Sequence, residues 1–333
     1  MVGTETQEVE RKVLAILRIV GDSAEPMGAR LIARRLKDYG IDLTERAVRY
    51  HLKLMDERGL TRLVGRDGRV ITEQGREEMR SALVQDKVGL VLSRIEMLAF
   101  QTSFDFRTCT GTIPVNISFF PKDKFARAKT LMAPAFKAGL CAGDRVAVAG
   151  EGERIGEHVV PQGKVGLATV CSVLVNGVLL KAGVPMDSRF GGILQIRNYR
   201  PLRFIELIYY AGTSLDPSEV FIRGKMTSVR KAAGQGNGKI LANFREFPAP
   251  CRPIVDEVIS RMNEVGLGAI LTTGNTSEPL CQIPVDLNKV GMILVGGMNP
   301  VAAAEEGGIE ADNRAGSTVV DYGSLVRFDD LRL

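Results

Sequence analysis

Apolar positions at the start of the chain recur with the period of an α-helix. The first stripe predicts an amphipathic helix that ends near Gly21, with apolar members Val9, Val13, Ile16, Leu17 and Val20. A second helix is predicted from about Gly28 to Tyr39, where Gly40 can end it. A third is predicted from Thr44, a favourable N-cap, to about Arg58. Three short helices in succession indicate a small helical domain.

The third predicted helix has an apolar and a basic face. Val48, Leu52 and Met55 are spaced at i, i+4 and i+7, so they share one side of the helix. The opposite side carries Arg46, Arg49, Tyr50 and Lys53. A DNA recognition helix needs this division, because its apolar side packs on its neighbours while its polar side enters the major groove. Arginine can read guanine edges there, and lysine and tyrosine can reach phosphates.

A β-hairpin is predicted directly after the third helix. Residues 60–64 are strand-like, residues 65–68 (Gly-Arg-Asp-Gly) supply a turn, and residues 69–72 return. Arg62, Arg66 and Arg69 place positive charge on this hairpin, within reach of phosphates or the minor groove. A last helix, from about Glu73 to Val84, closes the domain.

Residues 1–84 therefore predict a winged helix-turn-helix domain that binds double-stranded operator DNA. The candidate DNA contacts are Thr44, Arg46, Arg49, Tyr50, Lys53, Arg62, Arg66 and Arg69. The alternative is a structural helical domain, or a protein–protein module, whose basic face is merely solvated. Charge distribution favours DNA: residues 44–69 carry seven cations and four anions, an excess of three in a chain of net charge +5.

Residues 85–105 predict a connecting helix. Its apolar stripe consists of Val88, Val91, Leu92, Ile95, Leu98 and Ala99. The helix is too short for a long coiled coil but suits a linker or a dimer contact. Readers of this type usually bind two half-sites, so we expect a homodimer.

The remainder of the chain contains one unit written twice. Five positions of the first copy match positions 127 residues later: Gly111, Ile113, Asn116, Phe120 and Pro121 correspond to Gly238, Ile240, Asn243, Phe247 and Pro248. Gly139-Leu140 matches Gly266-Leu267 at the same offset, and Asn176 is echoed by Asn299 at a slightly shorter one. An ordered series of matches indicates an internal duplication.

Each copy predicts the element order βαββαβ, which is typical of a ferredoxin-like sandwich. The first copy, about 106–200, includes a strand predicted from Val165 to Val175, a helix starting at Asn176 and a strand over residues 192–197. The second copy is about 235–333, and a segment with one strand-like run bridges the two. The predicted fold class is α+β: a winged helix-turn-helix followed by a duplicated ferredoxin-like domain over 106–333. Two related halves offer a pseudo-symmetric cleft for a ligand.

Residues 165–193, VGLATVCSVLVNGVLLKAGVPMDSRFGGI, combine hydroxyl, amide and cationic side chains with glycines in short turns. Ser172, Asn176, Lys181, Ser188 and Arg189 could bind a small mono- or dicarboxylate, because glycine admits close backbone approach and the cations supply charge. The alternative is that Lys181 and Arg189 form solvated ion pairs and the glycines serve turns.

Composition narrows the class of protein. Five cysteines without a C-x-x-C pair, and only two histidines, exclude a zinc site of standard spacing, so the cysteines read as small buried residues. No apolar run approaches the length needed to cross a bilayer, and the polar N-terminus is unlike a signal peptide. We expect a cytoplasmic protein with no metal and no cofactor.

Three stretches resemble the NrpR-type nitrogen regulatory repressors: VCSVLVNGVLLKAGVPMDSRFGG, the later VGMILVGGMNPVAAAEEGGI, and the basic helix TERAVRYHLKLMDERGL. The resemblance covers nearly the whole chain. It implies repression of nitrogen-assimilation genes with 2-oxoglutarate as effector. The effector candidates within the matching stretch are Cys171, Ser172, Asn176, Lys181, Ser188 and Arg189. Some family members carry two regulatory domains and this chain has room for one, so a second NrpR-type chain is a possible partner.

Two other classes of protein stay open. An enzyme fused to a DNA-binding module would need a nucleophile–base pair or a phosphate loop, and the G-x-x-x-x-G-K-[ST], G-x-S-x-G and H-E-x-x-H motifs are absent from the sequence. We therefore expect no enzymatic activity. A DNA-binding protein whose C-terminal region only oligomerises is the remaining alternative.

Overall fold

The computed structural model describes residues 2–23, 25–81 and 88–331. The chain forms two compact units, Met1–Met97 and Leu98–Leu333, and the division falls inside helix α6, Leu90–Gln101. The junction expected between the last helix of the reader and the connecting helix, at residues 84–85, lies outside the described residues.

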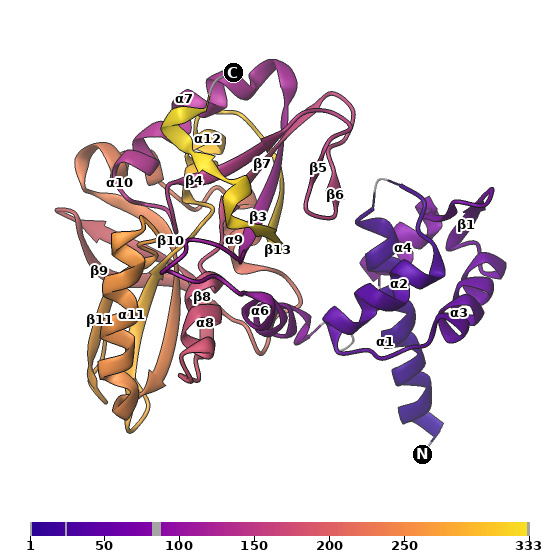
Figure 1. Ribbon diagram of the computed structural model, residues 1–333, viewed down its shortest axis with the longest axis horizontal. Helices are drawn as coiled ribbons and strands as arrows, with labels where there is room; N and C mark the ends of the chain where they lie inside the picture. Colours follow the sequence, from indigo (N-terminus) through magenta and orange to yellow (C-terminus); the bar gives the residue numbers. More distant parts are fainter. Residues whose placement is uncertain (1, 24, 82–87, 332–333) are drawn as a thin grey trace. The chain divides into compact units, whose positions relative to one another are not determined.

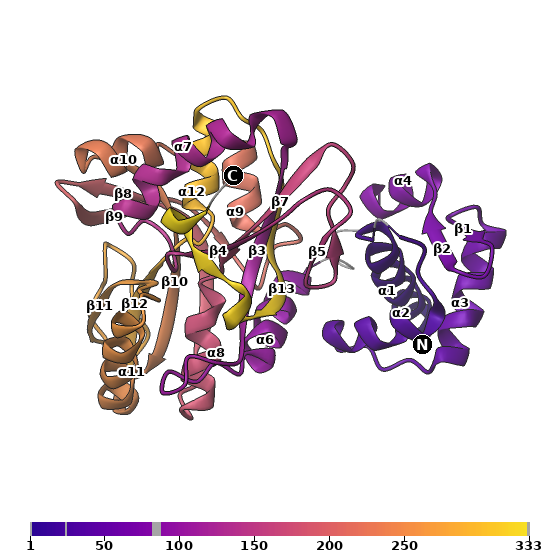
Figure 2. The same cartoon turned by 45° about the horizontal axis from the view of Figure 1, so that its top comes forward.

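The N-terminal unit has the elements that the hydrophobic pattern predicts, drawn in indigo and violet in Figures 1 and 2. They are α1 (Val2–Gly21), α2 (Ala29–Leu36), the 3₁₀ turn η1 (Lys37–Tyr39), α3 (Glu45–Glu57), β1 (Thr61–Val64), β2 (Gly68–Ile71) and α4 (Glu73–Ser81). Strands β1 and β2 pair antiparallel, with Thr61 opposite Ile71 and Val64 opposite Gly68. The predicted winged helix is confirmed.

A single apolar core holds this unit together. Its fully buried members include Ile16, Leu17, Ile32, Leu36, Val48 and Leu52. Burial of each such side chain contributes about 1.5–3 kcal/mol. The hairpin is fixed at Gly68, whose φ is 133° and whose position leaves no room for a Cβ, because that atom would lie 2.3 Å from the Met27 carbonyl carbon.

The C-terminal unit contains two five-stranded sheets. Their strands are β3 (Thr112–Pro121), β4 (Arg145–Ala149), β7 (Lys164–Val170), β8 (Asp187–Arg197), β9 (Arg200–Tyr209), β10 (Gly238–Pro248), β11 (Ile270–Thr276), β12 (Lys289–Val295), β13 (Asp312–Asp321) and β14 (Val326–Arg327). One sheet has the order β13-β3-β7-β4-β14 and the other β11-β12-β10-β8-β9. A separate small hairpin joins β5 (Arg154–Ile155) and β6 (His158–Val159).

Six helices accompany these sheets among the described residues. They are α7 (Phe125–Lys137), α8 (Val173–Lys181), α9 (Pro217–Arg223), α10 (Val229–Gln235), α11 (Arg252–Glu264) and α12 (Asn299–Glu306). The bridge between the two copies supplies β9, α9 and α10. The first copy thus reads β3-α7-β4-β7-α8-β8 and the second β10-α11-β11-β12-α12-β13, which confirms the predicted βαββαβ order in both.

The two copies exchange their last helix and strand. Strand β8 of the first copy pairs antiparallel with β10 of the second, with Gly192 opposite Ala242. Strand β13 of the second copy pairs with β3 of the first, with Val319 opposite Pro114. The helices follow their strands: α12 packs on α7, and α8 packs on α11 (Figure 1). Each sandwich is therefore built from both copies.

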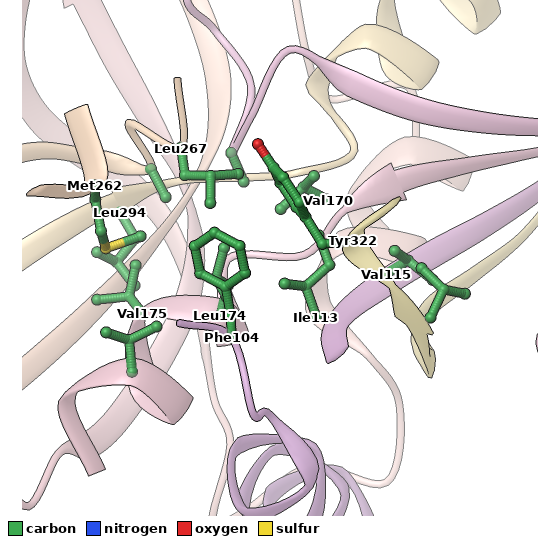
Figure 3. Close-up of a cluster of buried hydrophobic side chains, with 14 of the residues drawn as sticks. Phe104, Ile113, Val115, Val170, Leu174, Val175, Met262, Leu267, Leu294 and Tyr322 are labelled. Carbon is green, nitrogen blue, oxygen red and sulfur yellow. The ribbon is translucent and has the colours of Figure 1, made fainter. Parts of the chain in front are cut away.

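One buried cluster draws side chains from both copies (Figure 3). Leu174 and Val175 of α8 lie in the same cluster as Met262 of α11 and Leu294 of β12, and Ile113 of β3 completes it from the other sheet. Neither half could bury these side chains alone, so the exchange makes the two copies one folding unit.

The strand predicted from Val165 to Val175 was too long. Strand β7 ends at Val170, and α8 already begins at Val173. Helix α8 is buried on nearly every side, from Val173 to Leu179. A short helix without a polar face has the same apolar run as a buried strand, so periodicity cannot separate the two.

Candidate DNA-binding surface and effector site

Helix α3 presents the basic face that the sequence predicts. The Oγ1 of Thr44 accepts a hydrogen bond from the backbone N–H of Ala47 (3.2 Å) and thereby caps the helix. Val48, Leu52 and Met55 are buried against the N-terminal core. The side chains on the other face are exposed: Arg46, Arg49, Tyr50 and Lys53. Thr44 itself acts first as the helix cap.

Two cations of this face have acidic neighbours on the same helix. Arg49 pairs with Glu45, and the Lys53 Nζ lies 3.9 Å from a Glu57 carboxylate oxygen. Such exposed pairs are worth little, about 0.3–0.5 kcal/mol. Both cations can therefore exchange a carboxylate for a phosphate or a base edge at small cost.

The three arginines of the hairpin differ in their surroundings. Arg62 and Arg66 are exposed. Arg69 is not: its Nε donates to the Asp56 carboxylate of α3 at 2.7 Å, and only 19% of its side chain is accessible. Asp56 also accepts from the Thr61 hydroxyl at 2.6 Å. Arg69 therefore ties the hairpin to α3, and we remove it from the expected DNA contacts.

Three of the predicted effector residues meet in the C-terminal unit. Ser172 precedes α8, Asn176 lies on α8 and Ser188 on β8. The Asn176 Nδ2 donates to the Ser188 hydroxyl at 3.0 Å. Asn243 of β10 donates to the Ser172 hydroxyl at 3.0 Å and accepts from the Tyr210 hydroxyl at 2.5 Å. With Arg245, these residues form what we call the buried polar cluster: Ser172, Asn176, Ser188, Tyr210, Asn243 and Arg245.

Arg245 carries the charge of this cluster. Arg245 is only 1% exposed to solvent. The Nε donates to the Asn176 Oδ1 at 3.2 Å, the Nη1 donates to the Phe244 carbonyl at 3.3 Å, and the guanidinium lies 4.9 Å from the centre of the Tyr210 ring. Among the described residues no carboxylate forms an ion pair with Arg245. The hydrogen-bond partners of this buried cation are neutral, and the Asp216 carboxylate lies close enough to raise the pKa of both Tyr210 and Cys171.

Cys171 borders the cluster but has the features of a packing residue. It is 6% exposed, and burial raises the pKa of its thiol to about 11. Burial likewise raises the pKa of the Tyr210 hydroxyl to about 12, against the opposing effect of Arg245. Both groups are neutral at neutral pH, so Arg245 is the charged group of the cluster.

Lys181 and Arg189 are not hydrogen-bonded to the buried polar cluster among the described residues. The Lys181 Nζ donates to the Phe100 carbonyl at 3.2 Å and lies 5.2 Å from the centre of that ring. Arg189 forms ion pairs with Glu246 (2.9 Å), Asp286 (2.7 Å) and Asp187 (3.6 Å). Lys181 thus braces α8 through the Phe100 carbonyl, and Arg189 already has three anionic partners.

The three acids around Arg189 also bind Lys289. Its Nζ lies 2.9 Å from Asp187, 3.4 Å from Glu246 and 3.4 Å from Asp286. Hydrogen bonds from Arg189 and Lys289 hold the pKa of Asp286 below its usual value. The acidic oxygens lie within 4.8 Å of one another, and two cations, Arg189 and Lys289, already offset most of the charge of the three carboxylates.

Sequence reasoning missed Tyr210, Asn243 and Arg245. Asn243 belonged to the repeat match, but the strand predicted near residues 239–244 ended just before Arg245, whereas β10 extends to Pro248. A signal was present: the residue 127 positions before Arg245 is Ser118, so a buried strand position carries a cation in one copy only. A charged residue in one copy that corresponds to a neutral residue in the other is the pattern to look for.

Family models match both units. The model described as NrpR regulatory domains NRD1 and 2 matches residues 88–327, and the model of the Ribonuclease R winged-helix domain matches residues 14–79. The first match covers most of the chain. The second supports the fold of the N-terminal unit.

Relatives of known name are nitrogen regulators. The chain is 43% identical to the global nitrogen regulator NrpRI of Methanosarcina mazei, over 96% of this chain and 98% of that one. It is 32% identical to the global nitrogen regulator NrpR of Methanocaldococcus jannaschii over 97% of this chain, but spans only 55% of that longer protein. The crystal structure of a nitrogen repressor-like protein from Methanococcus jannaschii superposes with a TM-score of 0.60 at 28% identity, covering 72% of this chain and 98% of that one.

A winged helix with a basic recognition helix, joined to a duplicated α/β unit, defines a DNA-binding transcriptional regulator. The chain belongs to the NrpR family of nitrogen regulators. Like these relatives, it is a regulator and not an enzyme. None of the helices in the described part of the chain has the length and apolar character to cross a membrane.

Proposed function

We propose that this chain represses nitrogen-assimilation genes, binds operator DNA as a dimer in the cytoplasm, and is released by 2-oxoglutarate. The observation that carries the effector part is the buried Arg245, whose hydrogen-bond partners are all neutral. A buried charge that lacks its partner costs about 3–5 kcal/mol. An anionic ligand would remove most of this cost, so the cluster favours the bound state.

2-Oxoglutarate has the chemistry that the buried polar cluster can recognise. It carries two carboxylates and a keto oxygen, all hydrogen-bond acceptors. Arg245 can donate to one carboxylate, ideally in the two-pronged geometry of an arginine–carboxylate pair. The hydroxyls of Ser172 and Ser188 can rotate to donate to the other polar groups. Of the effector residues expected from the sequence, this proposal retains Ser172, Asn176 and Ser188, with Cys171 as their apolar neighbour.

The DNA-binding mode supports the proposed dimer. A winged helix reads only a few base pairs, so two copies on two half-sites are needed for useful specificity. Because the chain spans about half of the NrpR proteins of Methanocaldococcus jannaschii and Methanococcus maripaludis, a second NrpR-type chain is a further possible partner.

Calorimetry with 2-oxoglutarate, glutamate and glutamine tests the effector. We expect saturable binding of 2-oxoglutarate, weaker or no binding of the two amino acids, and loss of operator binding in the presence of 2-oxoglutarate. Coupling between the two ligands should be reciprocal and about 1–3 kcal/mol. If 2-oxoglutarate changes neither the thermal stability nor the operator affinity, the C-terminal unit only oligomerises and this proposal is wrong.

Arg49→Ala is expected to weaken operator binding by about 1–3 kcal/mol, because the exposed guanidinium on α3 would contact a base edge. 2-Oxoglutarate binding should not change. Operator affinity measured by fluorescence anisotropy checks this, with Arg223→Ala, an exposed arginine of the C-terminal unit, as control. Equal affinities for wild type and Arg49→Ala would take Arg49 out of the interface.

A further inference from the structure

A concavity lined by basic residues lies at the ends of β8 and β10. A cavity of about 340 Å³ opens there. Its lining residues come from β8, β10 and the segment around α10: Gln195, Ile196, Arg197, Ser228, Lys231, Asn237, Gly238 and Lys239. We call it the basic pocket. It shares no residue with the buried polar cluster.

The basic pocket contains three cations and no acid. Arg197, Lys231 and Lys239 are exposed, and within the described part of the chain none of them forms an ion pair. Arg200 of β9 lies directly opposite Arg197 in the β8–β9 ladder and adds a fourth cation beside the pocket. Like charges opposite one another in a sheet are destabilising. A bound anion would relieve this repulsion.

Neutral donors supplement the charges. The Ser228 Oγ accepts from the backbone N–H of Lys239 at 2.9 Å, which holds the hydroxyl at the pocket and leaves its proton to donate. The Gln195 Oε1 accepts from the Arg203 Nε at 3.1 Å, so the amide nitrogen is free to donate. Several donors around one concavity suit an oxyanion with several acceptor oxygens.

The duplication provides an internal comparison. Lys239 corresponds to Thr112 of the first copy at the offset of 127. Gln195 lies opposite Lys239, and the residue opposite Thr112 is Asp321. The same place in the other sheet therefore has a neutral residue and an acid. The fold does not require the positive charge of the basic pocket, so the charge calls for a functional reason.

We infer that the basic pocket binds a phosphorylated small molecule of about nucleotide size. Phosphate groups carry the charge that three unpaired cations can neutralise, and lysine is a good phosphate ligand as a point charge. The cavity volume lies at the lower end of the range of small-molecule sites, about 300–1,000 Å³. A concave site also suits a small ligand better than a duplex. The ligand would be a second signal beside the carboxylate effector.

Calorimetry of the full chain with ATP, ADP and inorganic tripolyphosphate tests this. The pocket variant combines Arg197→Gln, Lys231→Gln and Lys239→Gln. The control variant removes three exposed cations elsewhere on the same unit: Lys124→Gln, Lys137→Gln and Arg223→Gln. We expect wild type to bind at least one of the three compounds, with affinity falling as salt rises, and the pocket variant to lose at least tenfold. The control should stay within twofold of wild type.

The comparison of compounds identifies what is recognised. Equal affinity for ATP and tripolyphosphate would assign binding to the phosphates, and tighter binding of ATP would add a base-and-ribose contact. Three results would overturn the inference: no binding to wild type at millimolar ligand, equal losses in the pocket and control variants, or loss of duplex DNA binding alone in the pocket variant. Melting temperature verifies folding, and Lys239→Gln alone replaces the triple variant if that unfolds.

Discussion

Arg245→Met should abolish the response to 2-oxoglutarate while leaving the unliganded protein at least as stable as wild type. Removing one partner of a buried, hydrogen-bonded charge pair costs about 2–5 kcal/mol of binding, roughly thirty-fold to several thousand-fold in affinity. In the unliganded protein the same change replaces a buried cation whose hydrogen-bond partners are neutral by an apolar side chain of similar length. Such replacements are often neutral or stabilising. Calorimetry and thermal melting measure the two effects separately.

Arg189→Met is the matched control for Arg245→Met. Arg189 has three carboxylate partners, one of them the fully buried Glu246, so its loss should destabilise the fold. 2-Oxoglutarate should still bind. The opposite pattern, in which Arg189→Met loses the effector and Arg245→Met keeps it, would move the site to the ion pairs around Glu246. A large drop in melting temperature for Arg245→Met would make Arg245 a structural residue.

Gly297→Ala should disrupt the C-terminal unit. Gly297 lies in the turn before α12, where the second copy crosses the first, and a Cβ there would lie 2.2 Å from the Val170 carbonyl oxygen and 2.7 Å from the Asn116 Nδ2. Backbone cannot move aside as the end of a side chain can. The cost should reach the upper end of overpacking, about 3 kcal/mol or more. Urea unfolding measures it, and 2-oxoglutarate binding should fall with stability.

Gly212→Ala is the control for Gly297→Ala. A Cβ on Gly212 meets no other atom within 4 Å, so the same added methyl group should change stability by no more than about 0.5 kcal/mol. If Gly297→Ala also unfolds like wild type, the two copies do not meet as closely as this crossing requires. The difference in unfolding free energy between Gly297→Ala and Gly212→Ala measures the steric cost at the place where the two copies cross.

The proposed effector site differs in part from the set of residues expected from the sequence. The stretch around Ser172 and Asn176 carried its polar residues within one short segment, and both belong to the buried polar cluster. The stretch also holds Arg189, one of the two cations expected to bind a carboxylate. Burial and counter-charges decide such a role, and two of the three acids that pair with Arg189, Glu246 on β10 and Asp286 before β12, are far away in sequence. Arg245 was not among the residues expected from the sequence, because only the tertiary structure brings it close to Asn176.

The winged helix could be predicted almost residue by residue. Local periodicity predicts its helices. Thr44 and Gly59 mark the ends of α3, and the Asp-Gly turn marks the hairpin. Its basic face is also local, because four side chains of one helix share it. The role of Arg69 could be recognised only from the tertiary structure, because its partner Asp56 lies on a different element.

The sequence by itself determined the element order of the regulatory unit and its duplication, because periodicity and repeated glycines are properties of neighbouring residues. It did not determine which strand completes which sheet. Strands β8 and β13 could each have returned to their own copy with the same element order, and only the packing of α8 on α11 and of α12 on α7 selects the exchange. Strand pairing is a long-range choice made by total burial, so the buried polar cluster between the copies exists only in three dimensions.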